Sequence, residues 1–291
     1  MRRVIMHTLG YLLFALVVFS GYLYWTFPYD LLRQRLGDRL AQRGVLLSIA
    51  RLRPVLPLGL QAQDVRLRLD SLANDKAVAQ LATLRAQPDW RALLSGKLQM
   101  HFDAALYRGQ LQGSARWLTQ DAGKGWNIQA TFKDLDIAQH PLVQRNDQAF
   151  LRGRGDGEVK LTLNEQGSTQ AGSVNLSLQS VVFAGQILQL PLQRELACNT
   201  MKGSLTLDAQ QASNVTLTCS GDDLAIESKG TVKWQRPLGR SQLNLNWQLR
   251  SETAYKQELD LLSSVVRPRS PRRGELSFRL HGALQQPRFG S

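Results

Sequence analysis

From about residue 45 onward the chain alternates apolar and polar residues with a period of two, and this alternation constrains the fold more than any other feature. It is plain in VRLRLDSL from Val65, SVNLSLQSVVF from Ser173 and QLNLNWQLR from Gln242. Successive side chains of a strand point to opposite faces, so each segment predicts a strand with one apolar and one solvated face. The sequence therefore predicts a mainly β domain over residues 45–291, built as a long antiparallel sheet.

A weak repeat accompanies the alternation. A glycine, one further residue and an alternating strand recur as GEVKLTL, GSVNLSL, GSLTLDA, GTVKW and GELSFRL, which begin at Gly157, Gly172, Gly203, Gly230 and Gly274. The spacing is irregular, which argues against a strict solenoid. We interpret the pattern as a meander with glycines at strand entries and turns. Two short helices are expected to interrupt it, over residues 87–94 and 252–265.

The long apolar face of such a sheet needs cover, and the sequence offers few helices to supply it. Two arrangements remain open. In the first, the sheet closes or forms a sandwich around a filled core and holds no ligand. In the second, the sheet curls, and its concave apolar face holds acyl chains.

Residues 4–27 form an apolar run without Asp, Glu, Lys or Arg. A helix needs roughly 20 apolar residues to cross a bilayer, and this run is long enough. The aromatic residues Tyr22, Tyr24, Trp25 and Tyr29 at its end are typical of the headgroup level. We predict a single uncleaved membrane anchor over residues 1–28, in preference to a buried helix or a cleaved signal peptide, with the large domain on the outer side.

Residues 29–44 predict an amphipathic helix directly after the anchor. Leu32, Leu36 and Leu40 recur at four-residue spacing, and arginines occupy other faces. The helix either lies near anionic headgroups or packs on the folded domain with a solvated basic face. The residues predicted to meet the membrane interface are Trp25, Tyr29, Arg33, Arg35 and Arg39.

The net charge of +13 is spread along the chain rather than gathered in one cluster. It suits an anionic membrane surface, and we expect no nucleic-acid partner for a domain outside the cytoplasm. Cys198 and Cys219 are the only cysteines. Both follow the predicted anchor, so the sequence leaves open a disulfide or two buried thiols.

Motifs for catalysis are sparse. The histidines have no metal-like spacing, and no G-x-S-x-G nucleophile motif occurs. The glycines of RGRGDGEV, at 153, 155 and 157, precede a strand instead of a helix, so we interpret them as a turn and not as a dinucleotide site. Asp134 and Asp136 are interpreted as solvated strand residues. We expect no enzymatic activity, no cofactor and no metal site.

Four segments carry a resemblance to known families. They are WTFPYDLLRQRL at 25–36, RPVLPLGLQAQDVRLRL at 53–69, DWRALLSGKLQMHFDAALYRGQLQGSA at 89–115 and GELSFRLHGALQQPRF at 274–289. In this order they resemble the type II secretion system protein N (GspN) family. The entry P-x-G before a strand, the LL-x-G step and the G-x-L-x-x-P-x-F ending are also similar to AsmA-like proteins.

The resemblance implies a protein of the bacterial inner membrane with one membrane span and the bulk of its chain in the periplasm. For the secretion family it implies a non-enzymatic component that acts through contacts with other secretion-system proteins. For the AsmA-like proteins it implies a curled β-groove associated with lipid handling, with phospholipid as the partner. Neither family supplies catalytic residues.

Overall fold

The computed structural model describes residues 28–41, 45–55, 59–69, 77–119, 124–140, 149–187, 190–191, 195–208, 212–235, 240–251, 274–284 and 286–290, with single positions and runs of two or three residues elsewhere. Most of the predicted anchor, Trp25 included, lies outside these residues. Within the part of the chain that is described, no helix is both long and apolar enough to cross a membrane.

One antiparallel sheet dominates the molecule. Fourteen strands follow one another in chain order, and each pairs with the next, while the short β9 pairs with β8 alone. The strands are β1 Val45–Val55, β2 Gly59–Leu69, β3 Ala77–Pro88, β4 Gln99–Leu106, β5 Gly109–Leu118, β6 Gly125–Asp136, β7 Ala149–Asn164, β8 Thr169–Ile187, β9 Leu190–Pro191, β10 Leu196–Leu207, β11 Ala212–Ser220, β12 Leu224–Lys233, β13 Gln242–Ser251, β14 Glu275–Ala283 and β15 Gln286–Gly290. The predicted mainly β meander is confirmed.

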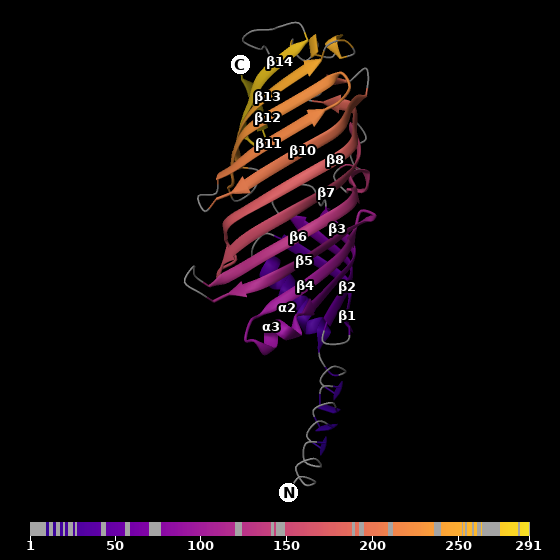
Figure 1. Cartoon of the computed structure of the whole chain (residues 1–291), viewed down its shortest axis with the longest axis vertical. Coiled ribbons are helices and arrows are strands. Elements are labelled where there is room, and N and C mark those ends of the chain that lie inside the picture. The colour runs from indigo at the N-terminus through magenta and orange to yellow at the C-terminus, as the bar shows by residue number, and fades with distance from the viewer. Residues whose placement is uncertain are drawn as a thin grey trace.

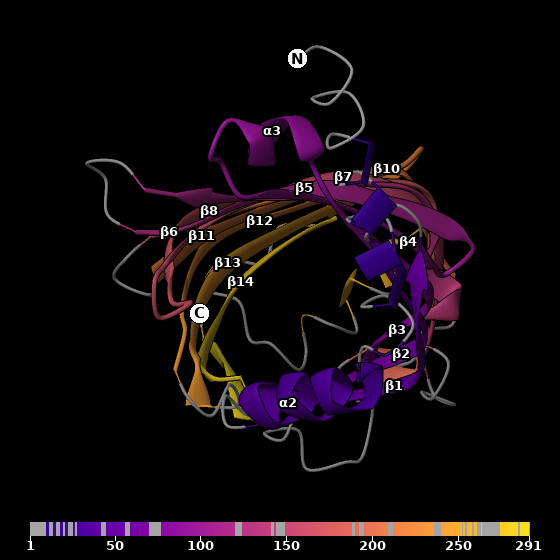
Figure 2. The ribbon, with the colours of Figure 1, turned by 90° about the horizontal axis from the view of Figure 1, so that it is seen from below.

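The strands stack along the long axis of the molecule and cross it obliquely (Figure 1). Seen along that axis, the sheet curls round on itself (Figure 2). The helices of the described chain are α2 Tyr29–Ala41, α3 Trp90–Leu94 and the 3₁₀ turn η1 Ile137–Gln139. The helix predicted over 87–94 is confirmed in its second half, because β3 continues to Pro88. Of the helix predicted over 252–265, positions 256, 257, 259, 260 and 263 are helical, and half of the segment lies outside the described residues.

Strand register separates the two faces of the sheet across its whole length. One row of directly paired residues crosses all fourteen strands and is apolar throughout: Pro54, Leu60, Ala86, Phe102, Gly113, Ala130, Val159, Val174, Leu205, Val215, Gly230, Leu245, Leu280 and Phe289. The neighbouring row points the other way and is polar except at its final glycine: Arg53, Gln61, Arg85, Asp103, Gln112, Thr131, Glu158, Asn175, Ser204, Thr216, Lys229, Asn246, Arg279 and Gly290.

The apolar face lies inside the curl. Its residues are buried or half-buried, whereas most of their polar neighbours along each strand are exposed. No layer of helices within the described chain covers this face, so the curl itself shields small side chains such as Ala104 and Ala130. Hereafter the apolar side is called the inner face and the polar side the outer face.

Bulges bend the sheet where its strands are longest. The register shifts between Phe132 and Leu135 of β6, where Asp134 has a φ of 53°. It shifts again between Arg152 and Arg154 of β7, around Gly153. A bulge bends its strand and raises the local twist, so these irregularities contribute to the curl.

Glycines inside the strands make room for large side chains on the inner face. A Cβ at Gly157 would collide with the ring of Phe132, and a Cβ at Gly113 with the ring of Phe102. The predicted turn at RGRGDGEV is therefore wrong, because these glycines lie within β7. The repeated glycines at 172, 203 and 230 likewise lie inside strands and not at their entries.

The best-buried part of the inner face spans β8 to β14. Its members include Leu178, Val181, Cys198, Met201, Cys219, Leu224, Ile226, Leu249 and Leu276. Cys198 of β10 and Cys219 of β11 form a disulfide with a Cα–Cα distance of 5.8 Å. Leu259, from the segment after β13, and Ile137 of η1 pack onto this cluster.

Candidate functional site: the inner apolar face

A second apolar row runs beside the first on the inner face. It crosses thirteen strands and consists of Leu52, Ala62, Leu84, Ala104, Leu111, Phe132, Gly157, Leu176, Gly203, Leu217, Ser228, Trp247 and Phe278. Fourteen strands give thirteen steps of about 4.8 Å, so the longer row measures about 60 Å. The hydrocarbon core of a bilayer is about 30 Å thick. The inner face thus offers an apolar path far longer than a compact core requires.

Aromatic rings line the C-terminal end of this path. The rings of Trp247 and Phe278 lie parallel, with centroids 6.2 Å apart. The ring of Phe289 meets Phe278 edge-on at 5.9 Å. These rings come from β13, β14 and β15, so the final strands end the path with a continuous aromatic surface.

Two polar groups interrupt the second row, and not the first, where β12 meets β13. Ser228 and Trp247 are directly paired across the strands, and Ser228 is only 2% exposed. The Ser228 hydroxyl and the Trp247 indole N–H are buried and bond to no group of the described chain. Buried polar groups normally have a partner, so these two unpaired donors are an exception on the inner face. The sequence signal for this site was a serine at an apolar position of an alternating strand.

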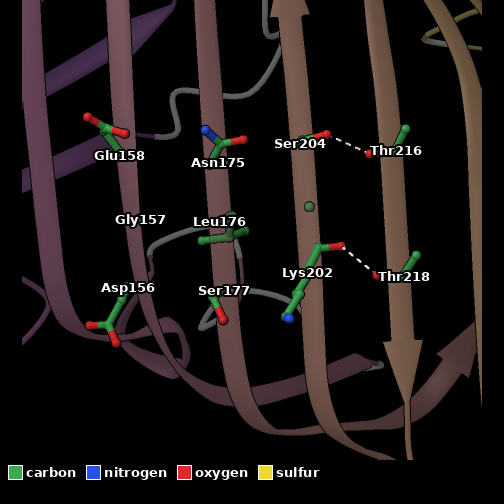
Figure 3. A pocket seen from close by; sticks show the side chains of 11 residues that line it. Asp156, Gly157, Glu158, Asn175, Leu176, Ser177, Lys202, Ser204, Thr216 and Thr218 are labelled. Atoms are coloured by element: carbon green, nitrogen blue, oxygen red, sulfur yellow. Dashed lines mark hydrogen bonds between the residues drawn. The ribbon is translucent and has the colours of Figure 1, made fainter.

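The outer face holds a polar hollow of about 430 Å³ over β7, β8, β10 and β11 (Figure 3). The backbone of Gly157 and Gly203 contributes to its lining. Its polar side chains are partly paired with one another, since the Ser204 and Thr216 hydroxyls lie 2.6 Å apart. Glu158 forms an ion pair with Lys160 at 2.8 Å. Most of the side chains that line this open hollow are polar, with Leu176 as an apolar exception.

The carboxylates of Asp134 and Asp136 have separate structural partners. Asp134 forms an ion pair with Arg154 at 3.4 Å, and Asp136 accepts a hydrogen bond from the Ala138 N–H at 3.1 Å. Asp156 accepts one from the Asp134 N–H at 2.8 Å. Among the residues described, no three His, Cys, Asp or Glu side chains gather as metal ligands would.

The predicted interface residues of α2 differ in environment. Arg33 donates to the backbone oxygens of Ile49 and Ala50 on β1, at 3.3 and 3.5 Å. Arg35 and Arg39 are exposed, and Tyr29 is half-buried. The helix therefore packs on the folded domain along the free edge of β1, which it partly covers, and Arg33 serves that contact.

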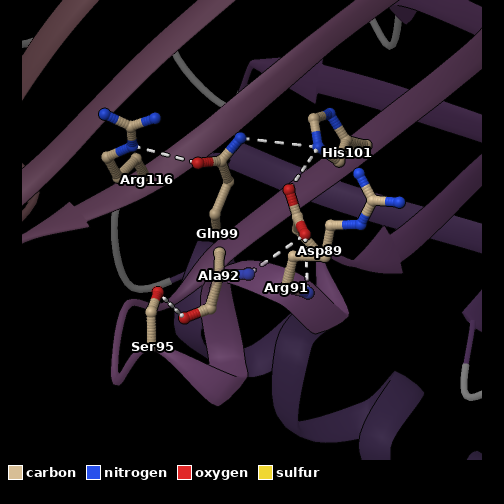
Figure 4. Close-up of polar contacts among 7 residues, drawn as sticks. All are labelled: Asp89, Arg91, Ala92, Ser95, Gln99, His101 and Arg116. Atoms are coloured by element: carbon tan, nitrogen blue, oxygen red, sulfur yellow. Dashed lines mark hydrogen bonds and ion pairs between the residues drawn. The ribbon is translucent and has the colours of Figure 1, made fainter.

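A polar network holds α3 in place (Figure 4). The Asp89 carboxylate accepts hydrogen bonds from the Arg91 and Ala92 N–H groups at 3.0 and 3.1 Å and caps the helix. The same carboxylate lies 3.3 Å from His101 Nε2. The hydrogen bond from Ala92, followed by that from His101, lowers the pKa of Asp89 below its ordinary value of 3.8.

This lowered pKa gives α3 a defined pH response. Because the folded state holds the Asp89 proton less tightly than the unfolded state, the stabilisation is present above pH 3.8 and is lost as the pH falls through the folded-state pKa. Replacing Asp89 with alanine should therefore speed amide exchange at Arg91 and Ala92 several-fold at neutral pH, compared with the native chain. Hydrogen-exchange mass spectrometry at matched pH should show this difference vanish in strong acid. An equal difference at every pH would contradict the assignment.

Comparison with family models, with curated proteins and with solved structures finds no match to this chain.

Proposed function

We propose that this chain is a non-enzymatic protein of the bacterial envelope whose inner face holds the acyl chains of lipids. The observation that carries the proposal is the register, which aligns apolar side chains into an unbroken row across fourteen strands on one face of a curled sheet. A filled core does not require a continuous apolar row of this length, because buried apolar residues stabilise a fold in any arrangement that packs them together. An apolar path about 60 Å long suits a ligand that is itself long and apolar.

Two further features support this proposal. The free donors of Ser228 and Trp247 suit the ester or carboxylate oxygens of a lipid whose chains lie along the path. The disulfide between Cys198 and Cys219 suits an oxidising compartment such as the periplasm. The curled sheet is also the form that AsmA-like proteins lead one to expect. The role in type II secretion, which the resemblance to GspN implies, stays a prediction, since no contact described above distinguishes it.

The two faces of β8 allow a closely matched test. Leu176 lies on the inner face, and its neighbour Asn175 lies on the outer face. We would replace each in turn with the photo-crosslinker p-benzoylphenylalanine in the full chain, expressed in bacteria. Irradiation followed by mass spectrometry should give lipid adducts at position 176 and none at position 175.

The control separates lipid held in the curl from lipid that merely surrounds a membrane protein. Adducts of equal yield at both positions would mean general contact with the bilayer. Adducts at neither would mean a closed core. Either result would contradict the proposal. The paired variants share one strand, so a folding defect would be seen as loss of the Cys198–Cys219 disulfide in the same spectra.

A further inference from the structure

The α3 segment exposes a cluster of large apolar side chains. Trp90, Leu93, Leu94 and Leu98 are all exposed, and Leu94 is 90% exposed. We call these four residues the α3 patch. On the neighbouring strands, Phe102 of β4 and Leu111 of β5 instead lie on the inner face. Apolar side chains gathered on an outer surface mark a contact site, because leaving them in water is unfavourable.

The patch is held rigidly outward. Asp89 caps the start of α3, and the Ser95 hydroxyl donates to the Ala92 carbonyl at its end. Gly96 then turns the chain with a φ of 74°, and its N–H bonds the Leu93 carbonyl at 2.9 Å. Lys97 N–H bonds the Ala92 carbonyl at 2.8 Å. The cap at Asp89 and the turn at Gly96 hold the backbone at the two ends of α3. The apolar side chains of the α3 patch are therefore held in a fixed position on the outer surface.

The charges around the α3 patch favour a partner with a negatively charged surface. Arg91 and Lys97 are exposed beside it, and α3 contains no acidic residue. The nearest carboxylate, Asp89, is engaged by the helix cap and by His101. Tryptophan prefers the headgroup level of a membrane, and apolar side chains flanked by cations suit the surface of anionic lipids.

The position of α3 agrees with a membrane partner. Figure 1 places α3 at the same end of the long axis as α2. Figure 2 places α3 and α2 on opposite sides of the curl. The described part of α2 also exposes Leu31, Leu36, Arg35 and Arg39. Two apolar and cationic helices thus flank this end of the sheet.

We infer that the α3 patch inserts into the surface of an anionic bilayer and seats this end of the curled sheet on the membrane. With α2 on the other side, the contact directs the long axis away from the bilayer plane. The inference does not depend on lipid within the curl, because the α3 patch and the inner face use different side chains and are tested at different positions.

The test places an environment-sensitive fluorophore on the patch. We would replace Leu94 with cysteine, label it with nitrobenzoxadiazole, and reconstitute the full chain into nanodiscs of phosphatidylethanolamine and phosphatidylglycerol. Nanodiscs leave both membrane surfaces open to added reagents. The matched control is the same label at Leu284, an exposed leucine in the turn after β14, which lies at the other end of the long axis.

At position 94 we expect a shift of emission to shorter wavelength, strong quenching by lipids that carry a quencher in their acyl chains, and several-fold weaker quenching by aqueous iodide than at position 284. Equal iodide quenching at the two positions would overturn the inference. So would a position-94 label that is protected from iodide but untouched by the lipid quencher, since a second copy of the chain would then cover the patch.

A charge test completes the experiment. The double variant Arg91→Gln and Lys97→Gln should weaken the lipid quenching at position 94 in the same nanodiscs. The matched pair Lys233→Gln and Arg240→Gln removes two exposed cations near the other end of the sheet and should leave the quenching unchanged. Equal effects of the two pairs would show that net charge alone acts, and this would contradict a docked patch.

Discussion

Replacing Leu276 with alanine is expected to lower the free energy of unfolding by about 2–5 kcal/mol. Leu276 lies on β14 with only 1% of its surface exposed, and it packs in the cluster that joins β8 to β14. Directly paired with Leu249, it has little room around it to collapse. The loss therefore combines the removed apolar contacts with the cavity that remains. Urea unfolding of the full chain in mild detergent, followed by tryptophan fluorescence, would measure it.

Leu284 provides the matched control, as it is the same residue type near the end of the same strand. It is 44% exposed, so its replacement with alanine should change stability by less than about 0.5 kcal/mol. A comparable loss in both variants would mean that the β14 cluster does not form as described.

Removing the disulfide should have a similarly large effect. Replacing Cys198 and Cys219 together with alanine is expected to cost about 3 kcal/mol, because a link across 21 positions no longer restricts the unfolded chain. Alanine avoids the buried hydroxyl that serine would introduce at these two buried sites. The same urea experiment would measure the change under non-reducing conditions.

Reductant supplies the control for this second prediction. Dithiothreitol should lower the unfolding midpoint of the native chain towards that of the double variant, and it should leave the double variant unchanged. A native chain that is insensitive to reductant in its unfolded state would show that the bond does not form in the protein.

The meander was predictable because the information for it is local. Val174 and Leu205 alternate with polar neighbours on their own strands, and that alternation alone defines which face each occupies. Short connections between consecutive strands then favour pairing in chain order. The curl was predicted because the sequence offers few helices to cover the apolar face of the sheet. The sequence left open whether the sheet would close, and in the described residues the sheet is curled with its first and last strands, β1 and β15, at opposite ends of the strand order.

The roles of glycines and polar groups inside the strands were harder to predict, because their surroundings depend on residues of the neighbouring strands. The sequence around Gly157 is typical of a turn. In the structure, however, the ring of Phe132, 25 positions earlier, occupies the place that a Cβ at Gly157 would take. The free donors of Ser228 and Trp247 depend on a strand pairing that the sequence does not state. For α3, the short helix was foreseen, but the outward direction of Leu94 depends on the cap at Asp89 and the turn at Gly96.

Because almost every strand pairs only with its neighbours in sequence, the sheet has low contact order for a β protein of its size. A chain with this connectivity could add strands one hairpin at a time, without waiting for its C-terminus. The same connectivity makes length an adjustable quantity. Insertion or deletion of one hairpin would change the apolar path by about 10 Å and leave every other pairing intact. The length of the apolar path in this architecture is therefore set by the number of strands.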